Sequence, residues 1–201
     1  MLALLLPIAF ATGLQEGDSW VSELTVRCVQ QAEKIDSRRV SRLLYSVIGV
    51  TAEFTTINVD VSPIPDDKSK PVRQVLVFNS GGVLVNRENT TNLDLARVRR
   101  MEWTAAEPRQ GISWSRNWPA KSDLLESKVT VKPTMRTEKD VTMLVNYLES
   151  GKSKATATVK VVAGLPIIED FEGTIMGSSV PGAKKPAVLI VSENLKELHL
   201  R

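Results

Sequence analysis

The sequence predicts an all-β protein with at most one or two short helices, built as an antiparallel β-sandwich or as a curled, partly open β-barrel. Two observations lead to this class. From residue 18 onward, apolar and polar residues alternate with a period of two in many short segments. Turns that contain Gly or Pro separate those segments, and no amphipathic helix of about 10–15 residues lies between them, so a parallel α/β sheet is disfavoured.

The first segments show the alternation clearly. Residues 20–31 are expected to form a half-buried strand whose apolar face carries Trp20, Ser22, Leu24, Val26 and Cys28. Residues 39–62 form a second extended region, in which Gly49 is a turn, a bulge or a bend. Residues 62–71, rich in Pro, Asp and Lys, predict a loop.

Two hairpins follow from the turn residues. Residues 72–79 and 83–85 flank Ser80-Gly81-Gly82, and residues 141–149 and 154–163 flank Ser150-Gly151. Thr91 is a candidate cap for a short helix over residues 91–98. Residues 128–132, 167–176 and 187–191 predict further strands. Residues 193–201 are ambiguous, because Leu195 and Leu198 fit a helical turn whereas Leu198 and Leu200 fit a strand.

The length of 201 residues suits a single β-rich domain over residues 12–201, since we find no internal repeat and no linker. The net charge is only +3, and the short Lys and Arg clusters lie among acidic neighbours. A nucleic-acid-binding protein concentrates its positive charge on one face or stripe. We therefore expect no nucleic-acid partner.

Residues 1–11 are apolar and end in Ala9-Phe10-Ala11. This pattern predicts a secretory signal peptide cleaved after Ala11, and hence an exported protein, periplasmic or extracellular. No Lys or Arg precedes the apolar run, which leaves two alternatives: a start further upstream, or a buried first strand or helix. No segment reaches the roughly 20 apolar residues of a transmembrane helix.

Residues for common catalytic chemistry are scarce. The chain has one Cys, Cys28, which is expected to be a small buried apolar residue, and one His, His199, near the end of the sequence. No spacing of His, Cys and carboxylates predicts a metal site, and no phosphate-binding or dinucleotide fingerprint is present. We expect a protein without cofactor, metal or enzymatic activity.

A pair of carboxylates supplies the enzymatic alternative. Asp170 and Glu172 would lie side by side on one face of a strand, while Glu169 and Phe171 would share the other. Such a pair is the arrangement of a glycosidase-like hydrolase, provided that both acids lie in a cleft and one pKa is raised.

An aromatic segment supplies the binding hypothesis. Trp103, Trp114 and Trp118 fall within sixteen positions, with Arg116 between the last two. In an extended segment Trp114, Arg116 and Trp118 share a face, on which the guanidinium can stack between the indole rings. This surface would bind an apolar ligand, a lipid or a carbohydrate. The alternative is that the tryptophans close the end of a β-barrel as part of its core.

Asn89-Thr90-Thr91 matches the acceptor pattern for N-glycosylation and lies in a predicted loop. The sequence as a whole favours an exported, non-enzymatic β-domain that binds a ligand or serves as an envelope or structural component. The alternatives are the hydrolase centred on Asp170 and Glu172, and an interaction module that adds a strand to a partner.

Overall fold

The computed structural model describes residues 13–31, 34–65, 70–80, 84–89, 114–118, 127–149, 153–162, 164–178 and 187–201. The segment expected to be a signal peptide, the helix candidate at Thr91, and Trp103 lie outside these ranges. Within them the chain is almost entirely strand, and no α-helix occurs. The prediction of an all-β protein is confirmed.

Eleven strands follow one another along the chain. Their bounds are β1 Ser19–Gln30, β2 Ile35–Val50, β3 Phe54–Ile64, β4 Val72–Asn79, β5 Leu84–Glu88, β6 Trp114–Trp118, β7 Ser127–Arg136, β8 Asp140–Glu149, β9 Ser153–Val162, β10 Ile168–Ser178 and β11 Ala187–His199.

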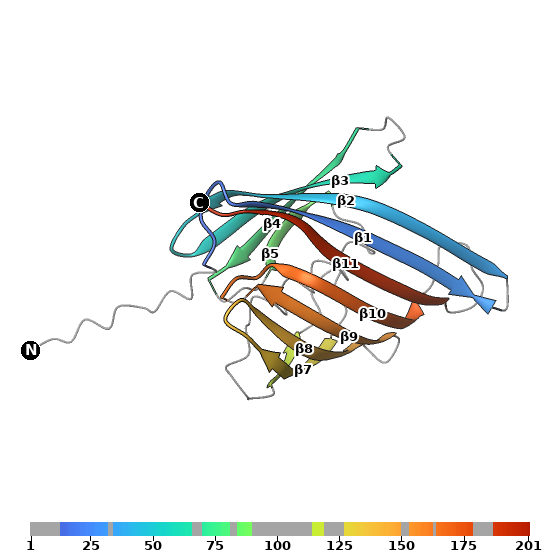
Figure 1. Ribbon diagram of the computed structural model, residues 1–201. Helices are drawn as coiled ribbons and strands as arrows, with labels where there is room; N and C mark the ends of the chain where they lie inside the picture. The colour runs from blue at the N-terminus through green and yellow to red at the C-terminus, as the bar shows by residue number, and fades with distance from the viewer. Residues whose placement is uncertain are drawn as a thin grey trace, which may run out of the picture.

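All eleven strands belong to one sheet with the order β5-β4-β3-β2-β1-β11-β10-β9-β8-β7-β6. Every neighbouring pair is antiparallel. The sheet therefore consists of two meanders, β1–β5 and β6–β11, joined where β1 pairs with β11 (Figure 1). It is not closed, because β5 and β6 are its two edges. Of the two predicted architectures, the curled open sheet is correct and the two-layered sandwich is not.

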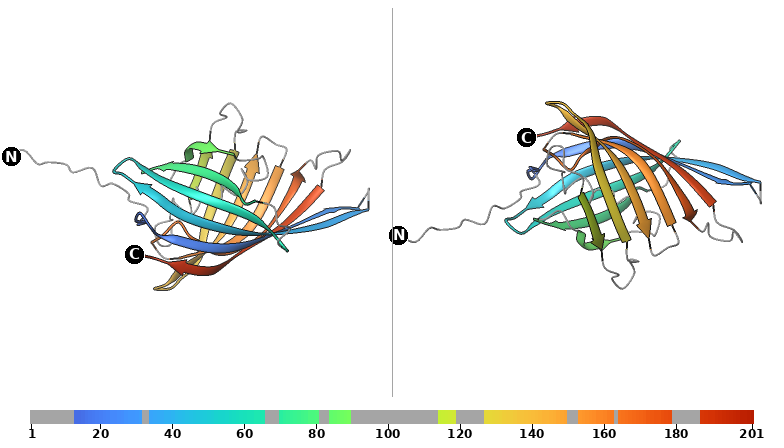
Figure 2. Two further views of the ribbon diagram at one scale, coloured as in Figure 1. Left: turned by 90° about the horizontal axis from the view of Figure 1, so that it is seen from above. Right: turned by 90° about the horizontal axis from the view of Figure 1, so that it is seen from below.

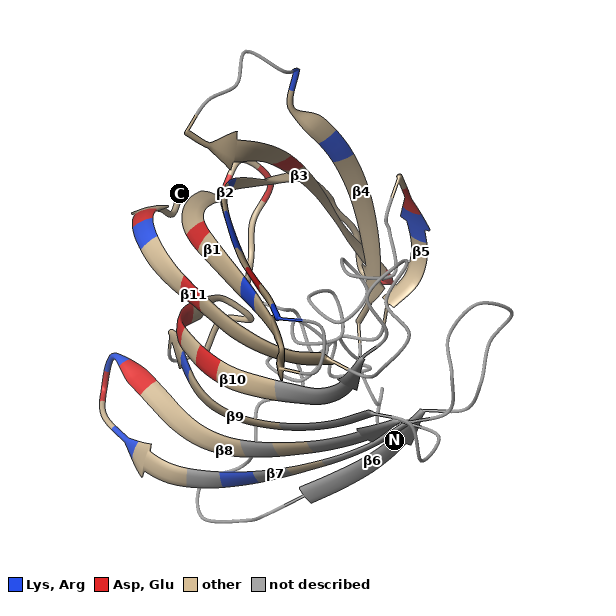
Figure 3. Ribbon diagram, turned by 90° about the vertical axis from the view of Figure 1, so that its right-hand side faces the viewer, with Lys and Arg blue, Asp and Glu red and all other residues tan. Residues whose placement is uncertain are grey.

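The sheet curves strongly, so that its two meanders face each other across an open arc (Figure 3). The hairpin of β1 and β2 is long and extends beyond the neighbouring strands at one end (Figures 1 and 2). Both predicted hairpins are confirmed: β4 pairs with β5 and β8 pairs with β9.

Gly49 lies at a bulge, one of the three roles that its position allowed. The pairing of β2 with β3 shifts register between Val47 and Gly49, and the chain turns only after Val50. The expected loop over residues 62–71 begins later than predicted, because β3 continues to Ile64 and Pro63 lies opposite Ser41. Proline is tolerated there because the pairing of β3 with β4 ends at Val61, so that Pro63 has a paired strand on one side only.

The ambiguous C-terminal segment is a strand with a bulge. The pairing of β1 with β11 shifts register between Val21 and Ser22, so that Ser22 lies opposite Leu195 and Trp20 lies opposite Leu198. Leu195 and Leu198 consequently pack on the same apolar cluster. A bulge inserts one residue into a strand, which produces the spacing of three that imitates a helical turn.

Asp18 holds both ends of the described chain against the sheet. Its buried carboxylate accepts hydrogen bonds from the backbone N–H of Gln15 at 2.6 Å and of Arg201 at 2.8 Å. Its carbonyl oxygen accepts from the N–H of Val47. The segment before β1 and Arg201, two residues after β11, are thus tied to the end of β2.

Candidate functional site

Among the described side chains, one face of the sheet is apolar from β5 at one edge to β8. Buried side chains form two clusters, one mainly on β2–β5 and one mainly on β8–β11, and Leu24 on β1 packs against both. The most completely buried apolar residues include Leu43, Val59, Leu76 and Val161, all at 0% exposure. Side chains converge on the inner side of a curved sheet, so we assign this buried face to the concave side and name it the inner face.

Polar groups interrupt the inner face where the two meanders meet. Tyr45 on β2 donates a hydrogen bond from its hydroxyl to Oε1 of Glu193 on β11, at 3.0 Å. Both residues are buried, at 1% exposure each. We call this contact the Tyr45–Glu193 bridge. Burial of a carboxylate in apolar surroundings costs free energy unless the carboxylate accepts hydrogen bonds. The bridge therefore stabilises the packing of β2 in one meander against β11 in the other.

The bridge spans β1, which lies between β2 and β11. Trp20 on β1 lies opposite Tyr45, and Leu24 lies opposite Glu193. The residue between these two on the same face of β1 is Ser22. The bridge therefore crosses β1 at Ser22, whose short side chain leaves room for it. Ser22 is completely buried, and its hydroxyl has no hydrogen-bond partner within the described part of the structure.

The ring of Tyr45 is fixed by stacking on Trp20. The two ring centroids are 4.7 Å apart and the planes differ by 9°. Stacked aromatic pairs of this kind contribute about 0.5–1.5 kcal/mol beyond the burial of their surface. Trp20 is itself buried, so the phenol hydroxyl is held in one position relative to Glu193.

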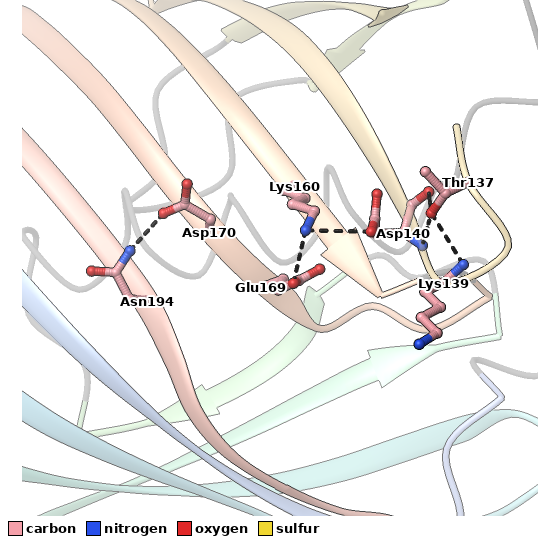
Figure 4. A network of polar contacts seen from close by, with 7 residues as sticks. All are labelled: Thr137, Lys139, Asp140, Lys160, Glu169, Asp170 and Asn194. Carbon is pink, nitrogen blue, oxygen red and sulfur yellow. Dashed lines mark hydrogen bonds and ion pairs between the residues drawn. The ribbon is translucent and has the colours of Figure 1, made fainter. Parts of the chain in front are cut away.

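Charged residues of both signs occur along many of the described strands (Figure 3), and most of them are exposed. We call the side of the sheet opposite the inner face the outer face. Lys160 on β9 contacts Glu169 on β10 at 2.8 Å and Asp140 on β8 at 3.3 Å (Figure 4). The hydrogen bond with Glu169 raises the pKa of Lys160 against the opposing effect of burial, and the bond with Asp140 adds to it. This ion-pair network links three adjacent strands.

The carboxylates of the hydrolase alternative lie on the same outer face. Asp170 and Glu172 are both exposed, and Asp170 accepts a hydrogen bond from the side chain of Asn194 (Figure 4). They therefore lack the cleft that the glycosidase-like chemistry requires. The expected pairing of Glu169 with Phe171 on one face is wrong: Phe171 is buried in the inner face, whereas Glu169 contacts Lys160 outside. The register shift between Ile168 and Asp170 explains the difference.

The aromatic segment is extended, as the binding hypothesis required. Trp114, Arg116 and Trp118 lie on β6, which is at an edge of the sheet and, among the described strands, pairs with β7 alone. Their side chains lie outside the described part of the structure, as does the whole of Trp103. The ligand-binding role of these four residues stays a prediction.

Cys28 is buried in the cluster of β8–β11, as predicted, and is a free thiol. The His199 side chain is 70% exposed and lies 3.7 Å from Glu197. Asn89 is exposed and follows β5, and its side chain donates to the carbonyl of Arg73. Among the described residues we find no group of three or more His, Cys, Asp or Glu arranged to hold a metal ion, and no helix of membrane-spanning length.

The sequence interpretation missed Tyr45 and Glu193 as site residues. A signal for Glu193 was present, because it continues the period-two series Ala187, Leu189 and Val191 onto the buried face. An acidic residue at a core position of a strand is unusual, because a buried glutamate needs a partner, and it therefore indicates a polar contact inside the core. Nothing in the sequence indicates that Tyr45 lies near it.

Comparison with known proteins extends the description of the fold. No protein-family model matches the sequence, and no curated protein matches it. Among solved structures, a chain described as "Lipid-protein interactions in lipovitellin" aligns with a TM-score of 0.53 at 10% sequence identity. The alignment covers 93% of this chain and 26% of the lipovitellin chain. At this identity the likeness concerns the fold alone.

A second solved structure, that of Rv2717c from M. tuberculosis, aligns with a TM-score of 0.36 at 8% identity. It covers 88% of this chain and 91% of the other. The chain thus spans about a quarter of the length of the lipovitellin chain and most of the length of Rv2717c.

Proposed function

We propose that this protein binds an apolar ligand, a lipid in the first instance, against the inner face of its sheet. The observation that carries the proposal is the wide, open and strongly curved sheet whose inner face is apolar on both meanders. Curved antiparallel sheets with an apolar interior are a recurrent way to enclose one small ligand.

The solved structure that aligns over 93% of this chain concerns lipid–protein interactions. At 10% identity this is an analogy of fold, and the same fold can serve different functions. It supports the choice of lipids as the first ligands to test. Export to the periplasm or the extracellular space and a non-enzymatic role are parts of the same proposal.

Binding can be measured directly on the purified chain. We expect extraction with organic solvent followed by mass spectrometry to recover a bound lipid, and a fluorescent fatty alcohol to bind saturably after that extraction. Trp114 and Trp118 on the edge strand β6 would then report binding through a change in tryptophan emission. Absence of saturable binding across fatty alcohols, fatty acids and phospholipids would refute the proposal.

A matched pair of variants locates the ligand. Leu24 lies on the inner face and contacts both clusters, whereas Leu44 is 38% exposed on the adjacent strand. Leu24→Gln should weaken ligand binding about tenfold, since burial of a leucine side chain is worth roughly 1.5–3 kcal/mol. Leu44→Gln should leave affinity unchanged. Equal effects of the two substitutions would place the ligand elsewhere.

The strand-addition alternative receives less support. The two edges of the sheet are β5 and β6, each of five residues. A short edge strand offers few backbone groups to a partner strand.

A further inference from the structure

The polar groups at the centre of the inner face are unusual for a surface that binds only hydrocarbon. Ser22, Tyr45 and Glu193 lie on three adjacent strands, β1, β2 and β11, and all three are at most 1% exposed. Their hydrogen-bonding capacities differ. The Tyr45 hydroxyl is already used as a donor to Glu193, the Glu193 carboxylate can accept several hydrogen bonds, and a serine hydroxyl both donates and accepts.

We propose that this cluster recognises the hydroxyl group of an otherwise apolar ligand, such as a long-chain or ring alcohol. The inference rests on the proposed function and specifies its ligand class. In the proposed complex the ligand O–H donates to the carboxylate of Glu193, and the ligand oxygen accepts from the Ser22 hydroxyl. Both groups lie on neighbouring strands at the point where the Tyr45–Glu193 bridge crosses β1.

The completely buried Ser22 hydroxyl is the independent observation. It has no hydrogen-bond partner within the described residues. An unsatisfied buried hydroxyl costs about 1–3 kcal/mol, and a ligand oxygen that accepts a hydrogen bond from it would remove this cost. A valine or alanine at position 22 would avoid this cost, since either side chain lacks a polar atom.

The same chemistry excludes other lipid head groups. A fatty-acid carboxylate has no proton to donate and would bring a second acid group against Glu193, and like charges repel strongly in a buried site. An alkane would leave Ser22 unsatisfied. We therefore expect the order alcohol, then alkane, then carboxylate among ligands of equal chain length.

The burial of the cluster has a kinetic consequence. A ligand hydroxyl can reach Ser22 only when the side chains over it move apart, and association that requires such a change is slow. We expect hexadecanol to associate with a rate constant well below about 10⁵ M⁻¹s⁻¹, which is slow even for two proteins that dock without a conformational change.

The test compares hexadecanol, hexadecane and palmitate as competitors of one fluorescent fatty alcohol, with the full chain and two variants. For the unaltered protein, hexadecanol should bind about tenfold more tightly than palmitate, because the palmitate carboxylate would lie against the carboxylate of Glu193. Glu193→Gln removes the negative charge and should abolish the discrimination against palmitate. Glu197→Gln, on the exposed side of the same strand, should preserve it.

Ser22→Ala covers the case in which Glu193→Gln does not fold. It should reduce the preference for hexadecanol over hexadecane by about fivefold and leave palmitate affinity unchanged. Tight binding of all three competitors without discrimination would overturn this inference while sustaining the proposed function. No binding of any competitor would overturn both.

Discussion

Gly173 on β10 lies beneath the ring of Phe171 on the inner face. A β-carbon at this glycine would lie 2.9 Å from two ring atoms of Phe171 and 3.0 Å from the β-carbon of Ala157 on β9. Phe171 is buried in the cluster of β8–β11 and cannot swing into solvent. Glycine is therefore required here by close packing, because the backbone conformation is ordinary.

We predict that Gly173→Ala lowers the free energy of unfolding by about 1–3 kcal/mol, the usual cost of overpacking a core. Gly49→Ala is the matched control, since nothing lies within 4 Å of a β-carbon placed there. Denaturation with urea would measure both. A loss in Gly49→Ala as large as that in Gly173→Ala would contradict the packing argument.

The Tyr45–Glu193 bridge leads to a second prediction about stability. Tyr45→Phe keeps the stacking ring and removes the hydroxyl that donates to Oε1 of Glu193. The expected loss is about 1–3 kcal/mol of unfolding free energy, because a buried hydrogen bond to a carboxylate is removed.

Thermal and urea unfolding would check the value for Tyr45→Phe, with Glu193→Leu and the double variant completing a cycle. The double variant should be less destabilised than the sum of the two single variants, since each removes the same contact. Strict additivity would show that the two side chains do not interact.

At the scale of the element, the sequence predicted strands well and their ends poorly. Period-two alternation identified β1, β4, β8 and β9. Along β4, and along the described parts of β8 and β9, buried residues alternate with more exposed ones. Bulges interrupt the period-two alternation. Each one places residues three apart on one face, as at Leu195 and Leu198, and the pattern then imitates a helix.

The candidate site was less predictable than the fold. Its side chains come from β1, β2 and β11, and β11 follows β2 by more than a hundred residues of sequence. Local alternation shows that Glu193 and Tyr45 face a core, but only the pairing of β1 with β11 brings them together. The sequence indicated the tryptophan-rich segment instead, because a cluster of a rare residue can be recognised without knowing which strands pair.

The ion-pair network on β8–β10 makes a pH-dependent contribution to stability. The pKa of Lys160 is raised in the folded state, chiefly by its hydrogen bond with Glu169. A raised lysine pKa stabilises the folded state fully below the unfolded value of about 10.4, and this contribution is lost as the pH rises through the folded pKa.

Lys160→Met should therefore be less stable than the unaltered protein at neutral pH, and the difference should shrink above about pH 10.4. Urea midpoints at a series of alkaline pH values would measure it. Lys139→Met, an exposed lysine in the adjacent turn, is the control. A difference that is constant with pH would show that Lys160 acts through its methylene groups alone.

Asp60 and Arg73 lie opposite each other on β3 and β4 and form two hydrogen bonds, at 2.8 and 2.9 Å. The hydrogen bonds lower the pKa of Asp60 and outweigh the effect of burial. The resulting stability is present above the unfolded pKa of about 3.9 and is lost as the pH falls through the folded value.

We predict that Arg73→Gln is destabilised at neutral pH and that the difference narrows in acid below about pH 3.9. Asp60→Asn should give the same pH profile, because it removes the same pair. Profiles that differ between the two variants would assign the effect to other contacts of Arg73.

For the whole molecule, stability should decrease from the centre of the sheet to its edges. β1 and β11 are paired on both sides over long segments, whereas β5 and β6 are paired on one side over five residues. Backbone amides open most easily where few neighbours protect them. Hydrogen exchange followed by mass spectrometry should show slowest exchange in β1, β2 and β11 and fastest in β5 and β6. Uniform exchange across the sheet would contradict this order.

The pairing of β1 with β11 also sets the order of folding. Its ladder places Ser19 opposite His199, almost the whole length of the chain apart, whereas each meander pairs strands that are neighbours in sequence. Contacts between distant residues form late, because the chain loses loop entropy before they are made. The two meanders should thus appear first as separate units, each with an apolar face open to water. Pairing of β1 with β11 joins the two faces into one inner face, and aggregation is the competing outcome until that step is complete.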